Sequence, residues 1–254
     1  QVAVIIQLLL VYRIANLLYK NKSVAFMASL VYFSLPIVLI ASRNLTTDAY
    51  LTTFVLAAIY CWQVYTSKRK TIFLYLFYTL VGLSLITKGP VALLFIIVYI
   101  IASKIIHKEG LRFSIHHFLG LLLCIVIGAS WYVTVMIENP KLWEYFFEKQ
   151  LISRINSNSF NRSKPFWFYV PILFALLLPW WLAIIPKLRV HIKSIPQKCK
   201  ESKILIYSSF ALFLLFSAFS TKLIMYILPL FWMPSIIIAV TIKHFSSKSK
   251  ANIT

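Results

Sequence analysis

The chain has 254 residues, of which 61% are hydrophobic and 16% aromatic, while only 13% are charged. A soluble domain needs more polar residues than this to cover its surface, so the composition excludes an ordinary soluble protein and indicates a membrane protein. The net charge of +20 is spread over short segments between apolar runs, which is typical of membrane topology and contact with membrane lipids. We therefore infer no nucleic acid partner.

Nine apolar stretches approach the length of about 20 residues that a helix needs to cross a bilayer. In chain order they are 1–19, 24–41, 49–66, 71–87, 90–106, 115–136, 166–186, 204–220 and 223–242. Because unpaired backbone groups are costly in hydrocarbon, we expect an all-α fold, namely a polytopic transmembrane helical bundle with about nine spans. We expect residues 1–254 to form a single multi-pass membrane domain.

The cysteines and the N-terminus indicate neither a disulfide or metal site nor a signal peptide. Cys61, Cys124 and Cys199 fit no metal-ligand spacing, so we expect neither a disulfide framework nor a metal site. The chain begins at Gln1 and enters an apolar run at once, without a basic leader or a small-residue cleavage site. We therefore expect a fragment whose true start is missing.

Alternate loops between the apolar stretches differ in their content of lysine and arginine. One set of loops carries 17 basic residues and the other carries 8. The positive-inside rule assigns the richer set to the cytoplasm, so we expect the C-terminus inside and the first residue outside the cytoplasmic membrane. The loops that contain Asp48, Lys88, Arg154 and Lys222 then share the outward face.

Two of these outward residues have both a structural and a chemical interpretation. Asp48, the only aspartate, directly precedes the apolar run 49–66, and an N-cap and a catalytic carboxylate are equally compatible with that position. Lys88 stands in the helix-breaking sequence TKGP at 87–90. A lysine there is more often an interfacial anchor than a phosphate contact.

The longest outward loop predicts an amphipathic helix that lies in the membrane surface. Its sequence NPKLWEYFFEKQLISRI, at 139–155, places an apolar stripe opposite charged residues. Arg154 at its end is either solvated or suited to grip a phosphate with two parallel hydrogen bonds. Lys222 and Tyr226 are four residues apart, so we expect them on one helical face. Each alone is an ordinary interfacial anchor, but with Arg154 and Lys88 they would line a cavity that suits a lipid phosphate.

Four parts of the sequence occur in a familiar order: TTDAYLTTFVLAAIYCW, GLSLITKGPVALLF, FFEKQLISRI followed by KPFWFYVPILFALLLPWW, and FSTKLIMYILPL. The ordered set resembles the aminoarabinose (lipid A) transferase and protein O-mannosyltransferase superfamily of C-type membrane glycosyltransferases, over about residues 1–242. Such enzymes move a sugar from a polyprenyl phosphate to lipid A, a protein or another glycan, outside the cytoplasmic membrane.

The resemblance implies an N-terminally truncated glycosyltransferase whose first helix and first acidic outer loop lie upstream. It places Asp48 at an outward acidic position of the catalytic site, and Arg154, Lys222 and Tyr226 near the donor phosphate. Lys88 joins the phosphate side because cations must stabilise the charge that develops on the leaving group. No metal is assigned and the cofactor is unknown. The alternative is a non-catalytic multi-pass transporter of a lipid-linked sugar or another lipid, which would favour paired broken helices.

Overall fold

The structure is a computed structural model that describes residues 1–44, 46–110, 113–140, 142, 164–182 and 199–251. Within these ranges every regular element is a helix, so the expected all-α fold is confirmed. The elements are α1 (Val2–Tyr19), α2 (Lys22–Phe33), α3 (Pro36–Arg43), α4 (Thr47–Lys68), α5 (Thr71–Lys88), α6 (Val91–His107), α7 (Ile115–Glu138), η2 (Phe166–Phe168), α10 (Tyr169–Leu176), α12 (Lys200–Ala218), η4 (Ile224–Leu230) and α13 (Trp232–Ala251).

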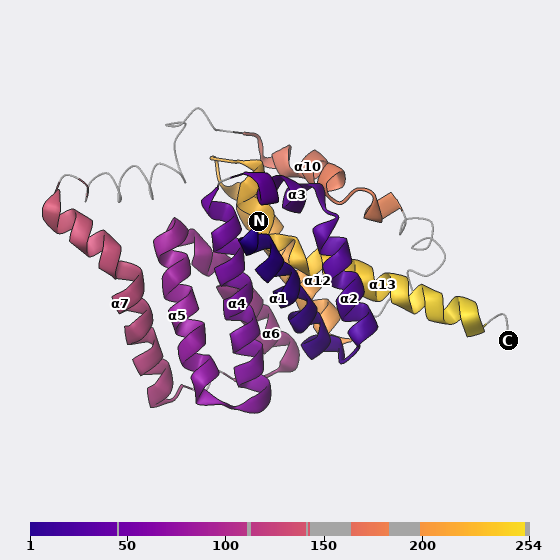
Figure 1. Ribbon diagram of the computed structural model, residues 1–254, viewed down its shortest axis with the longest axis horizontal. Coiled ribbons are helices and arrows are strands. Elements are labelled where there is room, and N and C mark those ends of the chain that lie inside the picture. The colour runs from indigo at the N-terminus through magenta and orange to yellow at the C-terminus, as the bar shows by residue number, and fades with distance from the viewer. Residues whose placement is uncertain (45, 111–112, 141, 143–163, 183–198, 252–254) are drawn as a thin grey trace.

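The helices stand side by side with α4 in the middle (Figure 1). α4 packs against α1, α5, α6 and η4, and α5 continues the layer to α7. Its buried positions include polar side chains such as Asp48, Thr52 and Gln63. A central helix is surrounded by protein rather than lipid, so it can carry polar groups that a lipid-facing helix cannot.

The protein is a multi-pass membrane protein by the length and composition of its helices. Four helices, α1, α5, α7 and α12, are long and apolar enough to cross a membrane, and two bent helix pairs raise the number to six. The predicted number of about nine is not reached within the described residues. The shortfall includes α4, whose buried polar residues reduce its hydropathy, and α6, which has only 17 residues.

Two stretches predicted to be single helices are broken. The stretch 24–41 forms α2 and α3, which meet at 64°, because Pro36 forces the preceding Leu35 into an extended conformation. The stretch 223–242 forms η4 and α13, which meet at 54°, and Pro229 lies inside η4. Proline removes a helical hydrogen bond and clashes with the preceding turn, so neither stretch continues as one straight helix.

Small residues bring α5 and α7 close together. A methyl group at Gly82 of α5 would lie 2.9 Å from Cβ of Ile127 and 3.1 Å from the carbonyl oxygen of Cys124, both on α7. Gly128 faces Leu85 in the same way, one turn further along. Close backbone approach at small residues is a common basis of helix association in membranes, where the hydrophobic effect contributes little.

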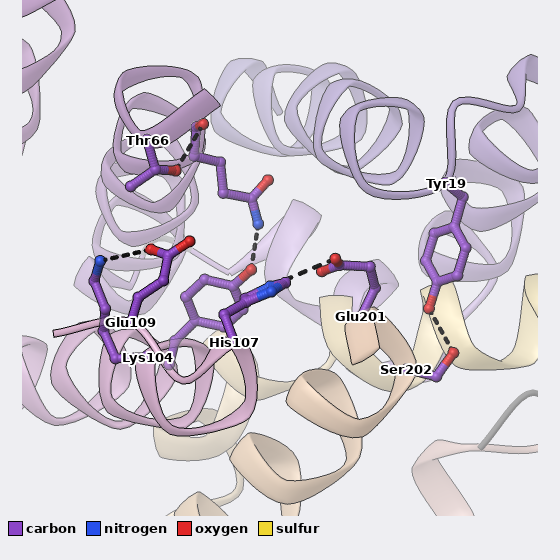
Figure 2. Close-up of polar contacts among 9 residues, drawn as sticks. Tyr19, Thr66, Lys104, His107, Glu109, Glu201 and Ser202 are labelled. Atoms are coloured by element: carbon purple, nitrogen blue, oxygen red, sulfur yellow. Dashed lines mark hydrogen bonds and ion pairs between the residues drawn. The ribbon is translucent and has the colours of Figure 1, made fainter. Parts of the chain in front are cut away.

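The turns between helices gather at two ends of the bundle. The Asp48 end consists of the start of α4, the turn 88–90 and the segment 219–226. The base consists of the turns 20–21 and 69–70, residues 108–110 and 113–114, and the start of α12. At the base, the Tyr19 hydroxyl and the Ser202 Oγ are 2.8 Å apart, and His107 pairs with Glu201 at 3.5 Å (Figure 2). The described turns alternate between the two ends as the loop-charge pattern predicts.

Candidate functional site

Asp48 lies inside the first turn of α4 and is 94% buried, with a relative exposure of 6%. The N-cap is Thr46, so the interpretation of Asp48 as the N-cap is wrong. Its carboxylate forms an ion pair with Lys88. The position still lets the negative charge interact with the positive end of α4. Asp48 is therefore a buried, paired carboxylate rather than a solvated capping group.

Lys88 is the last residue of α5 and is followed by a tight turn. Gly89 adopts φ 71°, a conformation that favours glycine, and Pro90 caps the start of α6. The turn therefore ends α5 and precedes α6 at the position that the sequence predicted. Besides pairing with Asp48, the Lys88 Nζ atom lies 4.2 Å from the centroid of the Tyr226 ring. This cation–π contact joins three predicted site residues in one cluster.

Lys222 lies in the extended segment between α12 and η4, with only 3% of its surface exposed. The expectation that Lys222 and Tyr226 share a helical face is wrong, because only Tyr226 belongs to η4. The Lys222 ammonium donates to the carbonyl oxygen of Lys164 at 2.9 Å and to that of Phe219. Burial lowers the pKa of Lys222 from its ordinary value. Through these hydrogen bonds, Lys222 connects the backbone at Lys164 to the 219–226 segment.

Tyr169 is a buried component of the Asp48 end that the sequence did not single out. It belongs to α10 and is fully buried, and its hydroxyl donates to the carbonyl oxygen of Leu223 at 3.0 Å. This bond holds the backbone directly between Lys222 and the Tyr226 helix. The aromatic run PFWFY at 165–169 was visible in the sequence, but an aromatic belt at the membrane interface explained it equally well.

Gln7 supports the start of α4 from α1. Its side-chain amide donates to the carbonyl oxygen of Ala49 at 2.8 Å and to Thr53 Oγ1 at 3.1 Å. Its side-chain oxygen accepts a hydrogen bond from the Tyr32 hydroxyl at 2.9 Å. All of these groups are buried. In the sequence, the signal for this role was a polar residue inside the apolar run 1–19. That signal did not show which helix Gln7 would contact.

Arg154 and the predicted surface helix at 139–155 lie almost entirely outside the described residues. The structure therefore brings Asp48, Lys88 and Tyr226 together and places Lys222 in the adjoining segment. Within the described ranges, no group of three or more His, Cys, Asp or Glu side chains could hold a metal ion. Chemically, the cluster offers a carboxylate that can accept a proton or orient a hydroxyl, next to a cation and a phenol.

Residues 1–133 match the family described as "Dolichyl-phosphate-mannose-protein mannosyltransferase". The undecaprenyl phosphate-alpha-4-amino-4-deoxy-L-arabinose arabinosyl transferase 2 of Proteus mirabilis is 30% identical over 233 residues, which cover 90% of this chain and 42% of that protein. Arabinosyl transferase 1 of the same organism is 29% identical over 252 residues, covering 96% of this chain and 45% of that protein. The chain thus spans less than half the length of these relatives.

Crystal structures of ArnT from Cupriavidus metallidurans share the fold. The structure bound to undecaprenyl phosphate superposes with a TM-score of 0.77 at 23% identity, covering 95% of this chain and 45% of ArnT. The apo structure gives a TM-score of 0.76 at 20% identity, covering 99% of this chain and 46% of ArnT. The helical arrangement of the present chain therefore corresponds to a little under half of a larger membrane protein fold.

Proposed function

We propose that this chain, which belongs to the dolichyl-phosphate-mannose-protein mannosyltransferase family, forms the membrane-embedded catalytic part of a glycosyltransferase with a polyprenyl-phosphate sugar donor. The observation that carries the proposal is the cluster of Asp48, Lys88 and Tyr226 at one end of the bundle. The names of the relatives support undecaprenyl phosphate as the carrier and 4-amino-4-deoxy-L-arabinose as the sugar to test first. Lipid A is the first acceptor to test, with a protein or another glycan as alternatives.

In the proposed reaction, an acceptor hydroxyl attacks the anomeric carbon of the donor sugar. The bond between that carbon and the phosphate oxygen breaks, and its electron pair leaves with the polyprenyl phosphate. Asp48 orients the acceptor hydroxyl and takes its proton. Lys88, Lys222 and Arg154 stabilise the negative charge that grows on the phosphate, and the Tyr226 hydroxyl donates a hydrogen bond to it.

The ion pair with Asp48 gives Lys88 a second role in the proposed reaction. Without donor, Lys88 holds the Asp48 carboxylate. An arriving phosphate competes for the same ammonium, so donor binding frees Asp48 to engage the acceptor. Both groups are largely buried, and electrostatic interactions are stronger in such surroundings than in water. Donor and acceptor binding are therefore coupled through one side chain.

The arrangement in the membrane follows the loop charges. The Asp48 end faces outward from the cytoplasmic membrane and the base, which is rich in lysine and arginine, faces the cytoplasm. In this proposal all nine apolar stretches cross the bilayer. They include α4, whose polar residues are buried against other helices, and the two bent helix pairs. The chain forms one membrane domain of a longer enzyme, consistent with its covering less than half of its relatives.

The test is a transfer assay with the full-length protein in liposomes. Undecaprenyl-phosphate-linked 4-amino-4-deoxy-L-arabinose and lipid A are supplied, and the acceptor is analysed by mass spectrometry. We expect a mass increase of one sugar residue per transfer. The same liposomes without acceptor test the alternative, because a transporter would move the lipid-linked sugar across the bilayer without consuming it. Movement without transfer to any of the three acceptor classes would overturn the proposal.

A further inference from the structure

Two adjoining chambers open at the base of the bundle, at the other end of α4 from Asp48. The first has a volume of about 400 Å³ and the second about 280 Å³. Both are lined by Trp62, Thr66, Lys104 and Glu109, so these residues form the boundary between them. Trp62 is the chamber residue of α4 nearest to Asp48 in the chain, and the helix rises about 21 Å between them, so the chambers do not belong to the Asp48 cluster.

The first chamber is cationic with aromatic walls. Arg69, Lys104 and Lys108 line it, and the Phe113 and Trp62 rings lie among them. Lys104 forms a 3.0 Å ion pair with Glu109 (Figure 2) and lies 6.0 Å from the centroid of the Trp62 ring. Among the described residues, three basic side chains and one carboxylate line the chamber, so its lining favours an anion.

The helix ends around the first chamber change this balance only slightly. α4 and α6 end there, and each C-terminus contributes about half a negative charge, while the N-terminus of α7 contributes about half a positive one. Arg69 and Lys108 are the C-cap residues of α4 and α6. They neutralise those two ends and leave the lining net positive.

The backbone at these caps indicates that the basic side chains matter there. Arg69 has φ 55° and Lys108 has φ 58°, both in the left-handed region where glycine or asparagine is usual. A residue with a side chain is less stable than glycine in this conformation. Lys20, the C-cap residue of α1, has φ 49° and lines the second chamber, so each of the three left-handed basic caps lies beside a chamber.

The second chamber contains a buried polar group with an unused hydrogen-bonding position. Gln63 lines it and is 6% exposed. One end of its amide bonds the Tyr99 hydroxyl, and the other end has no partner. Either orientation of the amide leaves one end unpaired. A buried polar group without a partner is costly, and here that group belongs to a residue in the wall of the second chamber.

Exposed apolar side chains lie beside the chambers. Ile72 and Leu76 of α5 and Phe118 of α7 are 60%, 43% and 66% exposed. They lie within two turns of the base, on helices that also line the first chamber. Exposed apolar surface next to a cationic pocket matches an amphipathic ligand, with acyl chains on the helices and a charged headgroup in the pocket.

We propose that the base chambers bind the headgroup of an anionic phospholipid, with its phosphate between Arg69, Lys104 and Lys108 and its remaining polar atoms toward Gln63. A phospholipid headgroup and free phosphate both offer an anion to the basic side chains. The exposed apolar side chains beside the chambers favour the lipid. The inference does not depend on the proposed function, because the chambers and the Asp48 cluster share no residue.

The test uses full-length protein that has been delipidated in a neutral detergent. Its melting temperature is followed by intrinsic fluorescence while phosphatidylglycerol, phosphatidylcholine with the same chains, or inorganic phosphate is added. A ligand that binds the folded state raises the melting temperature saturably. We expect this rise with phosphatidylglycerol only, and an affinity at least about tenfold lower in the double variant Arg69→Gln, Lys108→Gln.

Two further double variants make the result interpretable. Lys68→Gln with Lys70→Gln removes the same charge from exposed positions outside both chambers, and it should bind within about twofold of the original protein. Arg69→Lys with Lys108→Arg keeps the charges, so it should still bind, which separates binding from folding. Equal weakening in both Gln pairs, an equal response to phosphatidylcholine, or displacement of the lipid by inorganic phosphate at equal concentration would overturn the proposal.

Discussion

Lys88, at the end of α5, forms an ion pair with Asp48, in the first turn of α4. The two residues are 40 positions apart in the chain. The sequence suggested separate tasks for them, acceptor activation for the carboxylate and phosphate binding for the ammonium. Their pairing instead makes each residue the immediate environment of the other, so that changing one alters the task of both.

Asp48→Asn should reduce sugar transfer by at least about a hundredfold, because the amide keeps the shape but cannot take a proton. Product formation in liposomes measures the effect, and expression level and melting temperature serve as folding controls. Glu138→Gln is the matched control, since Glu138 is an exposed acid at the end of α7 and its loss should leave transfer unchanged. Turnover within about threefold of the original in Asp48→Asn would remove the carboxylate from the mechanism.

The Asp48–Lys88 pair should show energetic coupling in a double-mutant cycle. Asp48→Asn and Lys88→Met, alone and together, should give an interaction free energy of about 1–3 kcal/mol in unfolding experiments, because both groups are largely buried. The comparison cycle uses Lys104 and Glu109, whose carboxylate is 53% exposed. That pair should couple by less than about 1 kcal/mol. Additive effects at Asp48 and Lys88 would mean that the contact contributes nothing to stability.

Donor binding should weaken at high pH in a way that depends on Lys222. Burial lowers the pKa of this ammonium below the ordinary 10.5, so its charge is lost earlier as the pH rises. Since the phosphate needs the charged form, donor affinity should fall in the window below 10.5. Lys222→Arg should abolish this pH dependence, because the guanidinium stays charged.

The free energy of unfolding should change with pH in the opposite direction to donor affinity. A lysine whose pKa is lower in the folded protein binds its proton more weakly there than in the unfolded chain, so losing that proton stabilises the fold as the pH rises through the same window. Donor affinity and melting temperature should therefore move in opposite directions. An identical pH profile of donor binding in the original protein and in Lys222→Arg would exclude Lys222 as the titrating group.

Gly82→Ala should lower the melting temperature by several degrees. The added methyl group would lie 2.9 Å from Cβ of Ile127 on α7, which is closer than packed carbon atoms normally come. Overpacking of this kind costs about 1–3 kcal/mol. Gly110→Ala is the control, because a methyl group there meets nothing within 4 Å. Equal melting temperatures for the two variants would show that α5 and α7 can separate without cost.

The orientation of the bundle can be tested with single cysteines. In a background with Cys61, Cys124 and Cys199 replaced by alanine, Asn44→Cys at the Asp48 end and Ser67→Cys at the base both offer exposed positions. A membrane-impermeant maleimide added to intact cells should label Asn44→Cys directly and Ser67→Cys only after permeabilisation. The reverse pattern would place the Asp48 end in the cytoplasm and contradict the proposed reaction.

Much of the architecture follows from local sequence. Most helix boundaries are predicted to within a few residues, including the turn at Gly89 and Pro90, because apolar length and helix breakers act over a few residues. The bends at Pro36 and Pro229 were not predicted. Proline is tolerated in membrane helices when neighbouring groups satisfy the freed backbone, and that depends on the tertiary neighbours.

The sequence by itself determined that this protein is an all-helical membrane protein, because hydrophobicity acts on each segment independently. The placement of the candidate site residues on one set of loops stays a prediction from the loop charges. Only the tertiary structure decided which of those residues meet. It paired Asp48 with Lys88, set Lys222 against the carbonyl oxygens of Lys164 and Phe219, and buried Gln7 beneath the start of α4. These contacts join helices far apart in the chain, and their geometry depends on how the helices pack, which no single segment encodes.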